Sequence, residues 1–263
     1  MSILREAIKS QFSPEGRKAV RRTIDGIKWI YKGPARKWRA SQLDARIGKA
    51  AGRGWRSDIP FDLHYSIQRG LIEYTYRGIP MLKHPVEIAH YMRLIWECKP
   101  RTIIEIGSHA GGSAVWLSDI MQTYGIDGQV ISCDIRPPSP PVSKTNVKFL
   151  YGDVAALDQS LQLEQLAELK RPWLVIEDAS HRYADTLAAL RFFGPKLHSG
   201  EYLIVEDGNV LEMGDDAQFE GGPARAIAEF LDECSGTFRI DERTCDWYGR
   251  NVSGNPNGYL IRT

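Results

Sequence analysis

The chain has 263 residues, of which 43% are hydrophobic and 25% are charged, and its formal net charge at pH 7 is +1. These values are typical of an ordinary soluble protein, and the length suffices for one sizeable α/β domain with an appendage. No run of about 18 or more apolar residues occurs, so we expect no transmembrane helix.

The four cysteines are widely separated and form no Cys-x-x-Cys pair. This pattern favours buried thiols in a reducing compartment over a disulfide framework. The first residues, MSILREAIKSQF, lack the apolar core of a signal peptide. Together these features predict a cytoplasmic protein.

The beginning of the chain is strongly basic. Residues 1–56 contain 15 Lys and Arg against 4 Asp and Glu, a net charge of +11, whereas the remainder has a net charge of −10. Residues 14–32 carry apolar side chains at helical spacing, which predicts a basic amphipathic helix. This helix could lie on an anionic membrane surface, pair with another subunit or pack on its own domain. We expect no nucleic-acid binding, because no recognition motif accompanies the charge.

Residues 35–56 remain basic but have little apolar periodicity, and we interpret them as a linker. The predicted division is therefore a basic N-terminal helical arm and linker at 1–56 and a second domain at 57–263.

From about residue 57 the apolar pattern alternates between strands and helices. Such alternation predicts an α/β fold with a mostly parallel sheet covered by helices on both faces. The seven predicted strands are 102–106, 129–133, 147–150, 173–176, 202–205, 237–241 and 258–262. The predicted helices are 85–98, 112–124, 160–170, 183–193 and 222–234.

Two acidic pairs each end an apolar strand: Glu177-Asp178 and Glu206-Asp207. The carboxyl ends of parallel strands are where open α/β sheets bind ligands. Carboxylates that converge there repel one another unless a cation lies between them. Oxygen ligands without a nearby Cys favour Mg²⁺, Mn²⁺ or Ca²⁺ over zinc. Alternatively, one pair caps the helix that follows it.

A glycine-rich turn at 104–113 joins the first strand of the sheet to its helix, and it would let the backbone approach a ligand closely. It lacks the second glycine of the dinucleotide fingerprint. Asp134, at the end of the next strand, can accept hydrogen bonds from ribose hydroxyls. Asp153, after the third strand, could lie near an adenine. Each of these residues could instead cap a helix or form a turn.

Taken jointly, these segments resemble the class I S-adenosylmethionine-dependent methyltransferases, whose fold is a Rossmann-like α/β sandwich. The similar segments are EIGSHAGGSAVW, Asp134, Gly152-Asp153, VIEDASH and IVEDGN. More narrowly, the chain is similar to the cephalosporin hydroxylase-like family, which includes metal-dependent O-methyltransferases and rhamnosyl O-methyltransferases of glycolipids. The resemblance covers roughly residues 75–263.

The resemblance implies a role for each of these positions. It implies that S-adenosylmethionine binds along the glycine turn, that a divalent cation such as Mg²⁺ binds the acidic pairs, and that the protein is a homo-oligomer. The implied cofactor-binding residues are Glu105, Gly107, Ser108, His109, Gly111, Ser113, Asp134 (ribose) and Asp153 (adenine). The implied metal ligands are Asp178, Glu206 and Asp207.

Methyl transfer to a hydroxyl requires an aligned nucleophile that is losing its proton. His181 stands three residues after Asp178, where related catechol-type enzymes have a lysine base, and its reference pKa is near neutrality. We therefore assign catalytic roles to His181, as the base, and to Asp178. Alternatives for His181 are a helix cap, a partner of Asp178 or a hydrogen bond to substrate. Lys83 and His84, which precede the first helix of the fold, are candidates for the edge of the substrate cleft.

The leading function is a divalent-metal-dependent O-methyltransferase acting on a hydroxyl of a sugar in a glycan or glycolipid. The basic arm fits an anionic, lipid-linked acceptor and a location peripheral to the inner face of the membrane. Alternatives are a methyltransferase of a soluble secondary metabolite, a hydroxylase or oxidoreductase, and a non-catalytic binding protein. Oxidation ranks lower because no histidine lies in an H-x-D/E pair.

Overall fold

The computed structural model describes residues 47–263 apart from positions 137, 139–140, 162–165, 214–215 and 235, together with scattered positions before 47. The basic helix predicted at 14–32 lies outside this described part and stays a prediction. Among the described residues, no helix is both long enough and apolar enough to cross a bilayer.

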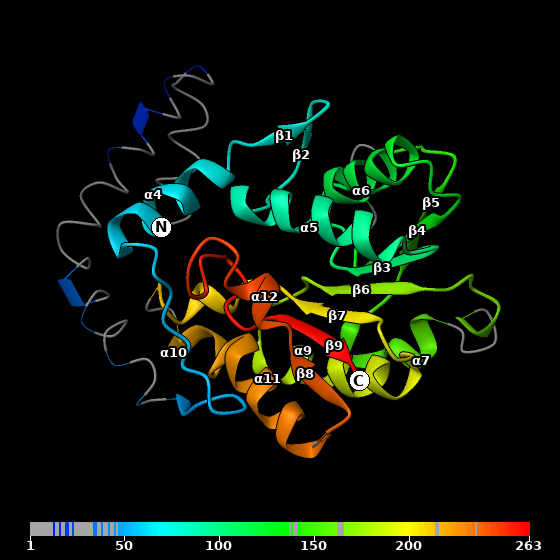
Figure 1. Ribbon diagram of the computed structural model, residues 1–263. Coiled ribbons are helices and arrows are strands. Elements are labelled where there is room, and N and C mark those ends of the chain that lie inside the picture. The colour runs from blue at the N-terminus through cyan, green and yellow to red at the C-terminus, as the bar shows by residue number, and fades with distance from the viewer. Residues whose placement is uncertain are drawn as a thin grey trace.

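A seven-stranded sheet in the order β5-β4-β3-β6-β7-β9-β8 forms the centre of the molecule (Figure 1). Neighbouring strands from β5 to β7 are parallel, and β9 runs antiparallel to both β7 and β8. The prediction of a mostly parallel seven-stranded sheet is therefore confirmed. The strands are β3 (Thr102–Ile106), β4 (Gln129–Asp134), β5 (Val147–Tyr151), β6 (Trp173–Glu177), β7 (Tyr202–Val205), β8 (Phe238–Ile240) and β9 (Tyr259–Arg262).

Helices cover both faces of this sheet. In Figure 1, α5 (Pro85–Cys98) and α6 (Gly112–Thr123) lie on one face, and α9 (Tyr183–Phe193) and α11 (Gly222–Glu233) lie on the other. Every residue of β3, β6 and β7 is buried. A strand covered on both faces is mostly apolar, which explains the apolar runs in the sequence, and Glu105 and Glu177 near the carboxyl ends of β3 and β6 are buried exceptions.

The helix predicted at 85–98 has the predicted bounds because the sequence carries its start and stop signals. Pro85 occupies the first turn, and the Nδ1 atom of His84 accepts a hydrogen bond from the backbone N–H of Val86 at 3.3 Å. Lys99 ends the helix in a left-handed conformation directly before Pro100.

Several elements were not predicted. They are α4 (Phe61–Leu71), a hairpin of β1 (Thr75–Tyr76) and β2 (Ile79–Pro80), and the short helices η1 (Val154–Ala156), α7 (Leu157–Ser160), η2 (Gly194–Lys196), η3 (Gly208–Val210), α10 (Asp216–Phe219) and α12 (Glu242–Cys245). The hairpin turn has positive φ angles at both Arg77 and Gly78. Such a turn usually carries Asn or Asp before the glycine, so the sequence signal is weak here. The helix predicted at 160–170 falls partly on positions outside the described residues.

The predicted linker at 35–56 differs from the structure over its last residues. Trp55 is fully buried, and its indole N–H donates to the carbonyl of Gly48 at 3.0 Å. Arg53 donates to Asp246 at 2.7 Å and forms an ion pair with Glu242 at 2.9 Å. The buried Trp55 and the ion pairs of Arg53 therefore hold residues 47–56 against the α/β domain.

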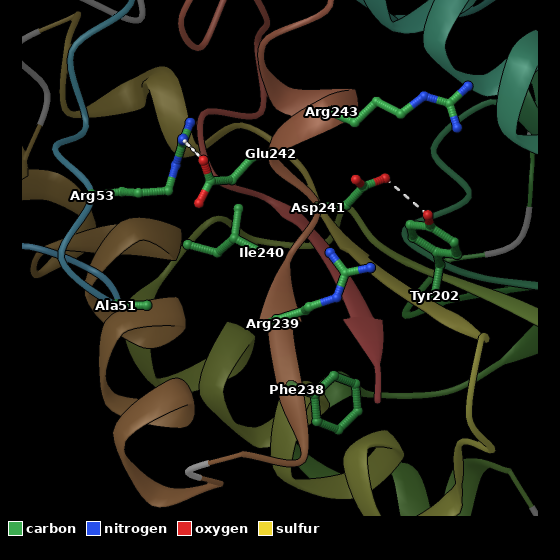
Figure 2. Close-up of a pocket in the computed structure, with 9 residues that line it drawn as sticks. All are labelled: Ala51, Arg53, Tyr202, Phe238, Arg239, Ile240, Asp241, Glu242 and Arg243. Atoms are coloured by element: carbon green, nitrogen blue, oxygen red, sulfur yellow. Dashed lines mark hydrogen bonds and ion pairs between the residues drawn. The ribbon is translucent and has the colours of Figure 1, made fainter.

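Arg53 and Glu242 also line a surface pocket beside β8 (Figure 2). The pocket includes Tyr202 and so lies at the amino end of β7. It contains none of the predicted site residues.

Two buried histidines connect α4 and α5 to segments that follow later in the chain. The Nε2 atom of His64 lies 2.8 Å from the amide nitrogen of Asn209, and the Nδ1 atom of His90 lies 3.0 Å from the hydroxyl of Tyr259. Burial lowers the pKa of each histidine to about 4. Both side chains are therefore neutral in the folded protein near neutral pH.

These two histidines should make the fold sensitive to acid. Between pH 6.5 and pH 4 the unfolded chain binds protons at His64 and His90 that the folded chain does not, so stability falls as the pH falls. At pH 5 we expect a loss of about 2 kcal/mol per histidine relative to pH 7.5. Urea unfolding at the two pH values measures this loss. A His90→Gln variant should show a smaller difference, and an unchanged difference would contradict the assignment.

Candidate active site

The candidate site lies at the carboxyl ends of β3, β4, β6 and β7. From β3 the chain continues to β4 on one side, while β6 lies on the other side of β3. Open α/β sheets bind their ligands at such a switch in strand order. The glycine turn and both acidic pairs all meet there.

The glycine turn lies directly against the end of β6. The backbone N–H of Asp178 donates to the carbonyl of Ile106 at 2.8 Å. Gly107 has φ +106°, and a Cβ atom at this position would lie 2.0 Å from the carbonyl oxygen of Asp178. Only glycine fits both the conformation and the contact. The turn thus links the predicted cofactor segment to the first acidic pair.

Most of the predicted cofactor residues lie within this turn or contact it. The carboxylate of Asp134 accepts hydrogen bonds from the backbone N–H groups of His109 and Arg136, both at 2.9 Å. The hydroxyl of Ser132 donates to Glu105 at 2.6 Å and lies 2.6 Å from the hydroxyl of Ser108. These bonds fix the shape of the turn.

The remaining cofactor candidates occupy the start of α6 and the end of β5. Gly111 precedes α6 with φ +85°, and Ser113 is buried in the first turn of that helix. Asp153 is exposed, and its carboxylate accepts a hydrogen bond from the backbone N–H of Ala155 at 2.9 Å. Asp153 therefore caps η1, which is the alternative role that the sequence left open, and its contact with adenine stays a prediction.

Asp178, His181 and Asp207 form a group on the open side of the strand ends. The Nε2 atom of His181 lies 3.2 Å from the Oδ2 atom of Asp207. One potential ligand atom from each of the three residues lies within 4.8 Å of the others. This set therefore fits a divalent cation. Its imidazole nitrogen suits Mn²⁺ and other transition ions at least as well as Mg²⁺.

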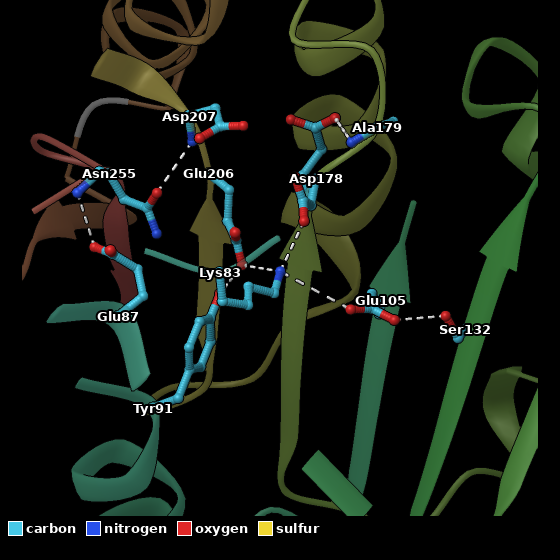
Figure 3. A network of polar contacts seen from close by, with 12 residues as sticks. Lys83, Glu87, Tyr91, Glu105, Ser132, Asp178, Ala179, Glu206, Asp207 and Asn255 are labelled. Atoms are coloured by element: carbon cyan, nitrogen blue, oxygen red, sulfur yellow. Dashed lines mark hydrogen bonds and ion pairs between the residues drawn. The ribbon is translucent and has the colours of Figure 1, made fainter. Parts of the chain in front are cut away.

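The side chain of Glu206 points away from the group of Asp178, His181 and Asp207. Its Oε1 atom accepts a hydrogen bond from the Nζ atom of Lys83 at 2.5 Å and another from the hydroxyl of Tyr91 (Figure 3). Of the three predicted metal ligands, the structure brings Asp178 and Asp207 together with His181. The carboxylate of Glu206 is already occupied by Lys83 and Tyr91.

Lys83 was predicted at the edge of the cleft, but the structure buries it at the centre of the acidic group. Its side chain is 1% exposed, and its Nζ atom lies 2.7 Å from Asp178 Oδ2 and 3.9 Å from Glu105 Oε1. The sequence signal for this position was a lone lysine in the short apolar stretch IPMLK before α5. The cation expected between the carboxylates is, at this point, a lysine side chain.

The backbone is strained at two residues of the open group. His181 has φ 58° and Asp207 has φ 55°, and both angles lie in the left-handed region that non-glycine residues rarely adopt. The backbone N–H of Asp207 donates to the side-chain oxygen of Asn255 at 3.0 Å and so helps to hold this conformation. Strain of this kind often marks a functional site.

Burial and neighbouring charges alter the acidity of these groups. Burial raises the pKa of Glu177 to about 7 and also raises the pKa of Asp207. Burial lowers the pKa of His181, but the charges of Asp207, Asp178 and Glu177 outweigh it and leave that pKa above the ordinary value. Such shifts cluster at functional sites.

The comparisons with known proteins agree on one family. The family model described as Rhamnosyl O-methyltransferase/CmcI matches residues 68–263. The rhamnosyl O-methyltransferase of Mycobacterium tuberculosis H37Rv is 30% identical over 193 residues, which cover 72% of this chain and 78% of that protein. The Mycobacterium leprae protein of the same name is 29% identical over 194 residues, covering 72% and 82%.

Solved structures of CmcI have a similar fold. A CmcI structure with Mg and SAM has a TM-score of 0.57 and 28% identity, and the match covers 82% of this chain and 89% of that one. A CmcI structure with SAH has a TM-score of 0.58 and 27% identity, covering 81% and 96%. The sheet and its helices thus form the class I methyltransferase fold.

The contact at Gly107 can be tested with alanine. Gly107→Ala should cost about 3 kcal/mol or more of unfolding free energy, since it combines left-handed strain with a backbone clash. Gly125→Ala is the matched control, because Gly125 also has positive φ but has no atom within 4 Å of an added Cβ. We expect that control to cost about 1 kcal/mol. Equal losses in urea unfolding would contradict the close contact between the turn and β6.

Proposed function

Because the chain belongs to the Rhamnosyl O-methyltransferase/CmcI family, we propose that it transfers a methyl group from S-adenosylmethionine to a sugar hydroxyl with the aid of a divalent metal ion. The observation that carries the proposal is that Asp178, His181 and Asp207 lie together directly beside the glycine turn. Family relatives named as rhamnosyl O-methyltransferases support a sugar as the acceptor.

The proposed cofactor site follows the glycine turn. The residues from Glu105 to Ser113 would line the methionine end, where backbone N–H groups at the start of α6 suit a carboxylate. Asp134 would bind the ribose hydroxyls, because each of its oxygens accepts one bond in the structure and can accept another. Asp153 would lie beside the adenine.

His181 is the proposed general base. Its imidazole contacts Asp207, which orients the ring, and its side chain is 25% exposed, so an acceptor can reach it. Asp178 and Asp207 would hold the metal, and Glu206, the third predicted ligand, would bind it only in competition with Lys83. When bound, Mg²⁺ supplies a positive charge that lowers the pKa of the acceptor hydroxyl. His181 would accept the hydroxyl proton while the oxygen attacks the methyl carbon and the bond from that carbon to sulfur breaks, which releases S-adenosylhomocysteine.

A single-atom change tests the metal assignment. Asp178→Asn should lower turnover by about 100-fold or more, since it removes a charged metal ligand. The same variant should bind S-adenosylhomocysteine with unchanged affinity in calorimetry. EDTA should abolish methyl transfer by the unaltered protein. An equal loss of cofactor affinity would assign Asp178 to the cofactor pocket, and activity that persists in EDTA would contradict the metal.

A second variant separates two roles of His181. If His181 is the base, the variant His181→Gln should reduce turnover by about 100-fold and leave the affinity for Mn²⁺ unchanged. If His181 is instead a metal ligand, the same variant should also bind Mn²⁺ more weakly. Titration of Mn²⁺ followed by electron paramagnetic resonance measures the difference. A loss of Mn²⁺ affinity would refute the base assignment.

The acceptor, the cellular location and the oligomeric state form the last part of the proposal. We propose a sugar in a glycan or glycolipid, and a cytoplasmic homo-oligomer whose basic arm binds the anionic inner face of a membrane. Methyl transfer from a labelled donor to a panel of sugars and small metabolites would identify the acceptor. Failure to bind anionic vesicles would favour the alternative, a soluble secondary metabolite. Oxidation has less support, because the metal-ligand group found among the described residues contains one histidine.

A further inference from the structure

The site gathers many more negative than positive groups. Glu105, Glu177, Asp178, Glu206 and Asp207 are all carried by the ends of three neighbouring strands. Among the described side chains that contact these acids, Lys83 is the fully buried cation. Buried carboxylates require such a partner, because an unpaired charge in the interior is very costly.

Lys83 is held in this position from both sides. Pro80, which ends β2, lies so close to α6 that a Cβ atom at Gly112 would be 2.3 Å from its carbonyl oxygen. Met81 is buried, and His84 caps α5 immediately afterwards. The ammonium group therefore reaches the acids from a fixed piece of backbone rather than from a mobile loop.

The strand ends have a buried inner side, with Lys83 and Glu206, and a more accessible outer side, with Asp207 and His181. Lys83 and Glu206 have side chains 1% and 4% exposed, whereas those of Asp178 and Asp207 are 19% and 33% exposed. Asp178 belongs to both sides, since it binds Lys83 and also lies in the metal-ligand group. A dication on the outer side would therefore share a carboxylate with the ammonium on the inner side. Two cations that share one carboxylate repel each other.

We propose that Lys83 is an internal counter-ion that competes with the divalent metal for Asp178 and Glu206 and thereby weakens metal binding. The inference rests on the proposed function, since it takes a metal at Asp178 as given. Without metal, the single charge of Lys83 offsets part of the negative charge of the two acids. With metal, Asp178 must divide its charge between two cations.

The test is the affinity of Mn²⁺ for Lys83→Met, measured by the resonance of free Mn²⁺. Removal of the ammonium should lower the Kd for Mn²⁺ by about tenfold or more. The metal-free variant should melt roughly 10 °C lower, because the buried Glu206 and the partly buried Asp178 lose their cation. Mn²⁺ should then raise its melting temperature more than that of the unaltered protein. If Lys83→Met does not fold, Lys83→Gln takes its place.

Tyr91→Phe is the matched control. It removes the other hydrogen bond to the same oxygen of Glu206 but leaves every charge in place, so its Kd for Mn²⁺ should stay within about threefold of the unaltered value. An unchanged or higher Kd in Lys83→Met would overturn the proposal and leave Lys83 a purely structural role. Absence of Mn²⁺ binding in both proteins would also overturn it. Binding of S-adenosylhomocysteine, measured in parallel, would show in that case whether the methyltransferase assignment still stands.

Discussion

The arrangement of the site depends on the pairing of Lys83 with carboxylates that the sheet forces together. Parallel strands end at one edge of the sheet, so the acids after β6 and β7 converge whatever their individual roles. Ionised carboxylates in a buried position are stable only when a cation and hydrogen bonds compensate them. Lys83 and Tyr91 provide this compensation for Glu206. Without it, burial of an ionised Glu206 would be costly.

This requirement explains the position of the segment before α5. The β1–β2 hairpin brings Pro80 against the start of α6, and three residues later Lys83 reaches the strand ends. Helix α5 then returns Tyr91 to the same carboxylate. A hairpin with two-residue strands is too short to be stable alone. It is held on α6, where the side chains of Tyr76 and Arg77 both donate to Asp119 at 3.0 Å.

The sequence predicts the strands well and the directions of the acidic side chains poorly. Continuous apolar runs mark strands covered on both faces, and the bounds of β3 and β7 followed from that pattern alone. Glu206 and Asp207 follow the last residue of β7, and Asp207 has φ 55°, so the directions of the two carboxylates are not set by the alternation of a strand. Which member points outward depends on the turn that follows. The partner of Glu206 lies 123 positions away, and no local pattern reveals such a contact.

The backbone that follows β7 lets a structural charge and a reactive group occupy neighbouring positions. Glu206 faces inward to Lys83, and Asp207 faces outward to His181. Asp207 and His181 each adopt a left-handed backbone conformation, which a strand continuing in regular geometry would not permit. Such strain costs about 1–3 kcal/mol per residue. At Asp207 the hydrogen bond from its backbone N–H to the side chain of Asn255 helps to offset this cost, next to the buried ion pair of Glu206 with Lys83.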